Sequence, residues 1–203
     1  MDHAFDNDQA ITRDSLYGTR AEPTYAGITS FMRRRYTRDL HGVDLVVSGV
    51  PFDTATTNRP GSRFGPRAIR AASIQSAWAR HFPWAFDPFD LLACIDYGDC
   101  HFDHGTPQDT PAAIEAHADR ILAAGCAMLT LGGDHFISYP LLKAHAKQHG
   151  PLALITSTRT ATPGRTRRAR ASTTAPCSTT PPARAWSTRR ARCRSACAPP
   201  TMT

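Results

Sequence analysis

The sequence predicts an α/β domain built on a parallel sheet, and three observations lead to this class. Short apolar runs with the length of buried strands alternate along the chain with segments of helical periodicity. The expected helices are bounded by proline in the first turn and by glycine after the last. One apolar run ends in paired glycines and two polar residues, a pattern that places side chains at the carboxyl rim of a sheet.

The individual elements follow from these patterns in chain order. Buried strands are expected at residues 43–48, 91–97, 127–131 and 151–155. Helices are expected at residues 66–74, from Thr110 to a stop at Gly125, and at residues 138–149, with Thr110 and Ser138 as N-caps and Gly150 as the end of the last helix. The loop at residues 54–66 carries Arg59 and Arg63, and long ordered loops are often functional.

Charge is distributed unevenly along the 203 residues. Residues 1–155 contain all 17 acidic groups and 14 of the 24 basic ones, whereas residues 156–203 contain ten arginines and no acidic residue. The formal net charge of +7 therefore originates in the C-terminal segment. The apolar fraction of 41% is ordinary and is enough for one globular domain.

Neither a membrane span nor a secretory signal is expected. No run approaches the roughly 20 apolar residues that a spanning helix needs, and the N-terminus is acidic where a signal peptide would be basic and then apolar. We therefore expect a cytoplasmic protein with no membrane partner. The cysteines before residue 156 lack zinc-type spacing and are expected to be small core residues or loop thiols; they are Cys94, Cys100 and Cys126.

Three clusters stand out in the sequence, and each has an ordinary structural interpretation. The arginines at residues 33–35 and 38 are more typical of a solvated face than of a nucleic-acid site. The aromatic residues between 78 and 89 are expected to pack an irregular segment; they are Trp78, Phe82, Trp84, Phe86 and Phe89. A metal site at Cys100, His101, Asp103 and His104 is disfavoured, because ligands this close in sequence need a special turn to reach one ion.

The stretch from Ala127 to Tyr139 organises the rest of the prediction. Its apolar run ends at Gly132-Gly133, and Asp134 and His135 follow before the next helix. Paired glycines allow the backbone to turn sharply and another group to approach closely. A histidine after a strand is by itself more often an ordinary loop or core residue than a ligand, so this pattern needs support from its surroundings.

Residues 40–155 resemble the N-terminal half of a ureohydrolase, and within that family the agmatinases. The matching segments are Gly49–Asp53, Arg59–Arg70, His81–Trp84, Asp96–Asp99, Leu131–Phe136 and Pro140–Ala146. The resemblance implies an arginase-like three-layer α/β/α sandwich and a homo-oligomer. It also implies hydrolysis of agmatine to putrescine and urea by hydroxide held between two Mn²⁺ ions, which lower the pKa of water. Another guanidino compound such as guanidinobutyrate is the alternative substrate.

The resemblance also implies roles for three residues at the glycine pair. His135 is expected to be a manganese ligand, and Asp134 and Gly133 are expected to help orient the site. No catalytic residue is assigned. The family's further ligands should come from an Asp-Ala-His-x-Asp motif after the strand at 151–155 and from a later Asp-x-Asp, and neither motif is present.

The segment after Ile155 leads to a hypothesis about the gene. Residues 156–203 contain no acidic residue and no histidine, yet codons for Thr156 to Gly164 moved back by one base permit His-Phe-Asp-Ala-His-Ser-Asp-Thr-Trp, which contains the missing motif. We therefore expect an N-terminal extension at 1–40, a truncated ureohydrolase half at 41–155 and a frameshifted, disordered basic tail at 156–203. This chain is then expected to be inactive and its oligomerisation doubtful. A natural disordered extension or a nucleic-acid-binding arm are the alternatives.

Overall fold

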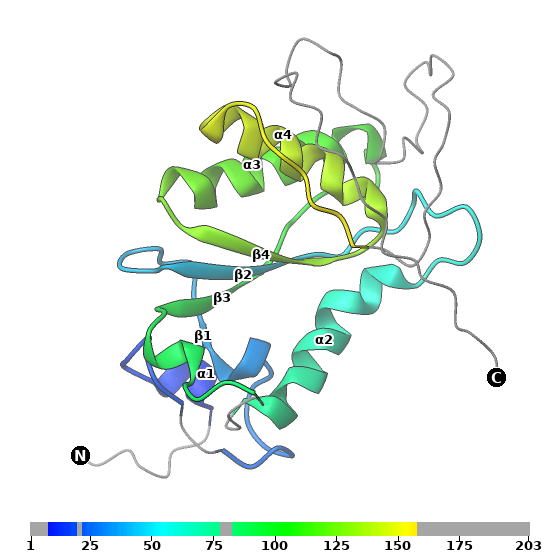
Figure 1. Ribbon diagram of the computed structural model, residues 1–203. Helices are drawn as coiled ribbons and strands as arrows, with labels where there is room; N and C mark the ends of the chain where they lie inside the picture. Colours follow the sequence, from blue (N-terminus) through cyan, green and yellow to red (C-terminus); the bar gives the residue numbers. More distant parts are fainter. Residues whose placement is uncertain (1–7, 20–21, 78–82, 158–203) are drawn as a thin grey trace, which may run out of the picture.

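A four-stranded parallel sheet with the order β1-β3-β2-β4 forms the centre of the molecule (Figure 1). This computed structural model describes residues 8–19, 22–77 and 83–157. The strands are β1 (Arg35–Tyr36), β2 (Leu45–Val50), β3 (Cys94–Asp99) and β4 (Ala127–Gly132). The parallel sheet predicted from the sequence is confirmed, with β2 and β3 starting two or three residues later than expected.

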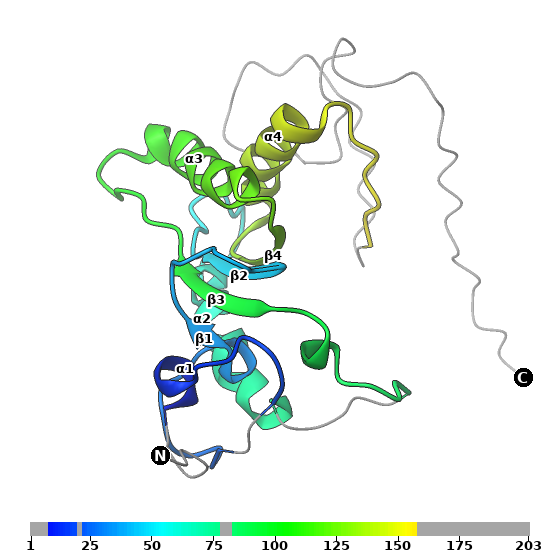
Figure 2. The same cartoon turned by 90° about the vertical axis from the view of Figure 1, so that its left-hand side faces the viewer.

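Helices cover both faces of this sheet, so the predicted three-layer arrangement is also confirmed (Figures 1 and 2). One face carries α3 (Thr110–Ala123) and α4 (Ser138–His149), which pack on each other. The other carries α2 (Gly65–Ser73) and the N-terminal segment with α1 (Gln9–Thr12). Short 3₁₀ turns connect these elements at Phe31–Arg33, Ser62–Phe64, Ile74–Ser76, Pro88–Asp90, Pro107–Asp109 and His135–Ile137.

Two of the expected helix starts are wrong in detail. The turn at Pro107–Asp109 runs directly into α3, so Thr110 is the first helical residue and not the N-cap. Ser138 is likewise the first residue of α4, because the turn at His135–Ile137 precedes it. The helix ends agree with the prediction, since Gly125 and Gly150 adopt positive φ angles of 79° and 78° where the chain leaves α3 and α4.

The core is divided between the two faces of the sheet because side chains alternate along each strand. Val46 and Ile95 pack with Ile121 of α3 on one face. Val47 and Leu131 pack with Phe89 on the other. Cys94, Cys100 and Cys126 are buried free thiols, which agrees with the first of the two expectations, small core residues.

The strand β4 lies at the edge of the sheet, which corrects the prediction of a fully buried strand. Among the described residues it pairs only with β2. Leu131 is buried, but Leu129 is 41% exposed. The strand expected at 151–155 is not formed either; that segment is extended, and Ile155 is 97% exposed because no described strand pairs with it.

The arginines expected on a solvated face are partly buried instead. Arg34 donates to the carbonyl oxygens of Met32 and Gly18, and its guanidinium lies 4.2 Å from the centre of the Phe89 ring. Burial lowers the pKa of Arg34 to about 10. Arg33 is also buried, whereas Arg38 remains exposed.

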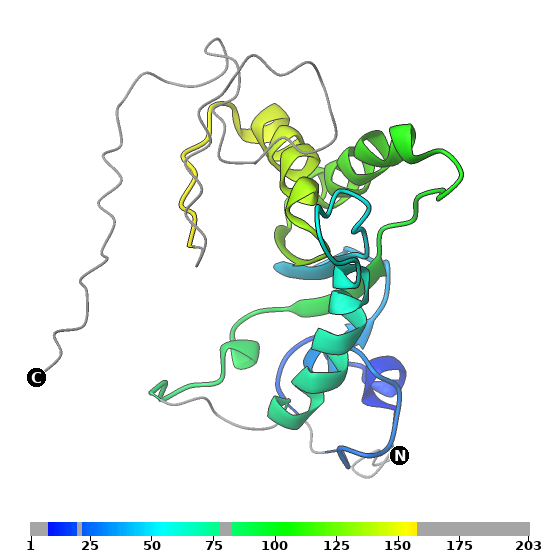
Figure 3. The ribbon, with the colours of Figure 1, turned by 90° about the vertical axis from the view of Figure 1, so that its right-hand side faces the viewer.

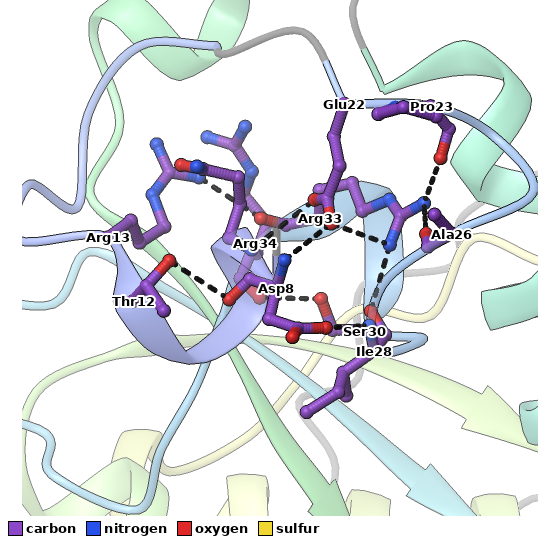
Figure 4. Close-up of polar contacts among 11 residues, drawn as sticks. Asp8, Thr12, Arg13, Glu22, Pro23, Ala26, Ile28, Ser30, Arg33 and Arg34 are labelled. Carbon is purple, nitrogen blue, oxygen red and sulfur yellow. Dashed lines mark hydrogen bonds and ion pairs between the residues drawn. The ribbon is translucent and has the colours of Figure 1, made fainter. Parts of the chain in front are cut away.

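Backbone oxygens explain how Arg33 is accommodated. Figure 4 shows its guanidinium pointing toward the carbonyl groups of Pro23, Ala26 and Ile28, to which it donates hydrogen bonds. Oε1 of Glu22 lies 3.5 Å from Nη1 of Arg33 and is its ion-pair partner. The sequence pattern showed the charges but not the carbonyl groups that surround them.

The aromatic segment before β3 divides into buried and exposed residues. Phe89 is buried, whereas Trp84 and Phe86 stack on each other with ring centres 6.0 Å apart and are both about half exposed. Trp78 and Phe82 lie outside the described residues. None of the described helices is long and apolar enough to cross a membrane.

Candidate functional site

The carboxyl ends of β2 and β4 are neighbours, so the segments that follow them leave the sheet side by side. Val50, the last residue of β2, is paired with Gly132, the last residue of β4. Residues 51–53 and 133–135 therefore form one rim. The edge of a parallel sheet at its carboxyl ends is where open α/β proteins place their chemistry.

Gly133 is required by the close packing of this rim. A Cβ atom at this position would lie 2.5 Å from the carbonyl oxygens of both Val50 and Phe52. The next residue fixes the contact, because the Asp134 N–H donates to the Phe52 oxygen at 2.7 Å. The structure confirms the close approach that the glycine pair predicts.

Asp134 joins the rim to the loop that follows β2. Its Oδ1 accepts a hydrogen bond from the Phe136 N–H at 3.0 Å and caps the turn at His135–Ile137. Its Oδ2 accepts from the Ala55 N–H, also at 3.0 Å. Burial raises the pKa of this carboxyl group, although both backbone hydrogen bonds oppose the rise. Asp134 therefore acts on the backbone and holds two segments together.

His135 is the exposed residue of the rim. It begins the turn after Asp134, and its Nδ1 lies 3.3 Å from the Ser138 hydroxyl at the start of α4. The His135 imidazole thus lies exposed at the carboxyl end of the sheet, in the turn that Asp134 caps.

Asp53 is a buried carboxylate at the same rim, and the sequence pattern assigned it no role. Oδ2 accepts from the Gly61 N–H at 2.6 Å and from the Arg63 N–H at 3.2 Å, and Oδ1 binds the Arg63 guanidinium through Nε at 2.6 Å. The Arg63 hydrogen bond, aided by these backbone donors, lowers the pKa of Asp53 to about 2 against the effect of burial.

The loop at residues 54–64 is consequently fastened at both ends to the rim. Asp134 holds Ala55, and Asp53 holds Gly61 and Arg63. Figure 3 shows this loop, drawn in cyan, between α2 and the start of α4. The signal in the sequence was an aspartate after a strand, followed by a loop that contains glycine, proline and an arginine. The pairing of Asp53 with Arg63 depends on the fold and does not follow from that signal.

A third group of charges lies at the end of β3. Arg70 of α2 binds the Asp96 carboxylate through Nε at 2.7 Å and Nη2 at 2.9 Å, and it binds Asp99 through Nη1 at 2.6 Å. Burial alone would lower the pKa of Arg70, but its hydrogen bonds to these two carboxylates raise it above the usual value. This cluster joins α2 to the sheet.

The described residues do not by themselves fit a two-ion metal site. No group of three or more His, Cys, Asp or Glu side chains suitable for a metal is found in the described part of the chain. The cluster after β3 does not converge: the Cys100 thiol is buried against the carbonyl oxygens of His101 and Ala113, and His104 packs on the Phe102 ring. His135 is therefore not part of such a group within the described residues.

Comparison with known proteins identifies relatives for most of the described region. The model of the arginase family matches residues 43–157. An agmatinase from Chromobacterium violaceum is 57% identical over 149 residues, which are 73% of this chain and 46% of that protein. An agmatinase from Neisseria meningitidis serogroup C is 52% identical over 113 residues, covering 55% of this chain and 37% of that protein.

Solved structures show the same likeness. A crystal structure of a hypothetical agmatinase from Burkholderia thailandensis superposes with a TM-score of 0.71 at 60% identity, covering 72% of this chain and 47% of that one. The proclavaminate amidino hydrolase from Streptomyces clavuligerus gives a TM-score of 0.59 at 38% identity, covering 65% and 44%. The chain spans less than half the length of each of these relatives.

Proposed function

The chain belongs to the arginase family, and we propose that it carries the N-terminal half of an agmatinase-type guanidino hydrolase. The observation that supports this proposal is the 57% identity to an agmatinase. The rim at the carboxyl ends of β2 and β4 agrees with it, because His135 is exposed there shortly after the paired glycines. The reaction is hydrolysis of agmatine to putrescine and urea. The guanidinium carbon is delocalised and a poor electrophile, so the reaction needs an activated water.

Two Mn²⁺ ions, when bound in the complete site, supply that activation by lowering the pKa of water. Within this chain His135 would hold one of the ions through an imidazole nitrogen. Asp134 and Gly133 position it, because Asp134 caps the turn that begins at His135 and Gly133 allows that turn to lie against Phe52. The loop at 54–64 is held to the same rim by Asp53 and Asp134.

The chain of 203 residues is inactive in this proposal because it offers too few ligands. Residues 156–203 contain no acidic residue and no histidine, and the family match ends at residue 157. A shifted reading frame after the Ile155 codon accounts for both facts. The chain then divides into an N-terminal extension at 1–40, a ureohydrolase half at 41–155 and an out-of-frame basic tail at 156–203.

The test compares this chain with a version in which one base is restored after the Ile155 codon. With Mn²⁺ and agmatine, the restored protein should release urea and hold about two manganese ions per subunit. The unaltered chain of 203 residues should release no more urea than its His135→Ala variant. Urea release above that control would contradict the proposed inactivity, and an inactive restored protein would contradict the frameshift.

Substrate choice is tested in the same assay. Guanidinobutyrate replaces agmatine in a parallel reaction of the frame-restored protein, and the product amine is identified in each case. Agmatine should be hydrolysed faster, as proposed from the agmatinase relatives. Faster hydrolysis of guanidinobutyrate would assign the protein to the other guanidino substrate.

A further inference from the structure

Two histidines lie one turn apart at the end of α4. The helix spans Ser138–His149, and His145 and His149 are four residues apart within it. Residues with this spacing are neighbours on one side of a helix. The two rings stack, with ring centres 5.9 Å apart and an angle of 28° between the ring planes. A single helix therefore brings the pair together, and no other element is needed to form it.

The contacts of α4 with α3 leave this pair accessible. Ala144 packs against α3, and the Gln148 amide donates to the carbonyl oxygen of Leu122 at 3.0 Å. Residues 144 and 148 therefore face α3, and the two histidines, each one residue farther along the chain, form the next row on the helix surface. In that row His145 is half-buried and His149 is exposed.

The lysines of α4 are engaged on another side of the helix. Lys143 Nζ lies 2.6 Å from Glu115 Oε2, and Lys147 Nζ lies 2.6 Å from Asp119 Oδ2, both on α3. Residues two apart on a helix point in nearly opposite directions, so these cations are directed away from the histidine pair. The last turn of a helix also carries partial negative charge from carbonyl groups that lack an intrahelical partner. The end of α4 is therefore a favourable place for a cation.

The two rings suit a divalent transition-metal ion. Imidazole nitrogen is a preferred ligand of Zn²⁺, Cu²⁺ and Ni²⁺, and two histidines four residues apart on one helix can bind the same zinc ion. The ion lies about 2.0–2.1 Å from each nitrogen, and small rotations of two rings that already stack can provide this arrangement. Within the described part of the chain no hydrogen bond uses a nitrogen of either ring.

We propose that His145 and His149 form a surface site for one divalent ion of the zinc type, with water completing its coordination. The site lies at the end of α4, whereas His135 precedes the start of that helix, so the two positions are separate. The bound ion joins successive turns of α4 and stabilises the helix before its end at Gly150. This role is independent of the proposed hydrolase activity.

Modification by diethyl pyrocarbonate, read for each histidine by peptide mass spectrometry, tests the site in the full chain. Thiols are alkylated first, and Zn²⁺ alone is titrated at about pH 7.5, where imidazole is mostly neutral. Zn²⁺ should protect His145 and His149 over the same concentration range. That range should lie about tenfold or more below the one that protects the exposed His41, because the second ligand binds at a high effective concentration. His149→Ala should remove this advantage at His145.

A variant with altered spacing is the matched control. Lys147→His combined with His149→Ala keeps the number of histidines but directs the two rings to opposite sides of α4. Lys147 is exposed, so its replacement should cost little stability. In this variant His145 should be protected no better than His41. His135→Ala should leave the protection of the pair unchanged, which separates this site from the proposed hydrolase site.

Three results would overturn the zinc-site proposal. Protection of the pair only at the Zn²⁺ concentration that protects His41 would mean that each imidazole binds independently. Unchanged protection of His145 in His149→Ala, or in the variant with altered spacing, would exclude a shared ion. Loss of protection in His135→Ala would assign the zinc to the rim.

Discussion

Replacing Asp96 with asparagine should destabilise the protein strongly, because this carboxylate is buried and carries an ion pair. The Asp96 carboxylate is fully buried and accepts four hydrogen bonds. Two come from the Arg70 guanidinium, one from the Phe31 N–H at 2.8 Å and one from the Gly98 N–H at 3.0 Å. A single carboxylate therefore connects α2, the N-terminal segment and the end of β3.

The magnitude follows from what asparagine cannot do in this position. It keeps one acceptor oxygen, turns an NH₂ group toward donors, and leaves Arg70 buried with Asp99 as its remaining counter-charge. Removing one partner of a buried ion pair typically costs about 3–5 kcal/mol, against a total stability of about 5–15 kcal/mol for a domain. The melting temperature should fall by roughly 6–20 °C.

Urea unfolding followed by circular dichroism measures this loss, and Asp99→Asn is the matched control. Asp99 binds the same guanidinium, but its side chain is 42% exposed. Its replacement should cost about 1 kcal/mol or less, as for other exposed ion pairs. Equal losses for the two variants, or a loss below about 1 kcal/mol for Asp96→Asn, would refute the idea that burial of Asp96 determines its contribution.

Two further predictions use the same unfolding measurement. Gly133→Ala should cost about 1–3 kcal/mol because its Cβ meets two backbone oxygens. Gly132→Ala should cost less, since its Cβ meets only the tip of a flexible side chain, and an equal loss would contradict the close-approach argument. Burial lowers the pKa of His117 from 6.5 to about 4, so the unfolded chain takes up this proton first and stability should decrease as pH falls from 6.5 to 4. His117→Gln should reduce that pH dependence and the exposed His41→Gln should not; identical pH profiles would exclude His117 as its source.

Most of the secondary structure could be predicted because local signals decide it. Apolar runs located β2, β3 and β4, and Pro66 and Gly150 marked where α2 begins and α4 ends. These signals depend only on neighbours in sequence. They are weakest where a 3₁₀ turn continues into a helix, since Thr110 and Ser138 then occupy the first helical position and have no capping role.

Burial was harder to predict because it depends on partners distant in sequence. An apolar run is the same whether or not a strand lies beyond it, so the exposure of Leu129 at the sheet edge was missed. Arg33 and Arg34 were expected in solvent because their charge is costly to bury. Carbonyl groups and an aromatic ring brought to them by the fold compensate for that penalty.

The candidate site combines both kinds of information. The paired glycines and His135 are adjacent in sequence, so a local pattern was enough to place them on one rim. The hydrogen bonds that clamp the loop join Asp53 to Arg63 and Asp134 to Ala55. They form because β2 and β4 are neighbours in the sheet, which no local pattern specifies. If that clamp holds the loop on the rim, Asp53→Asn should increase proteolytic cleavage within residues 54–64 while leaving the far end of the sheet protected. Uniform sensitivity along the chain would instead mean that Asp53 contributes only to global stability.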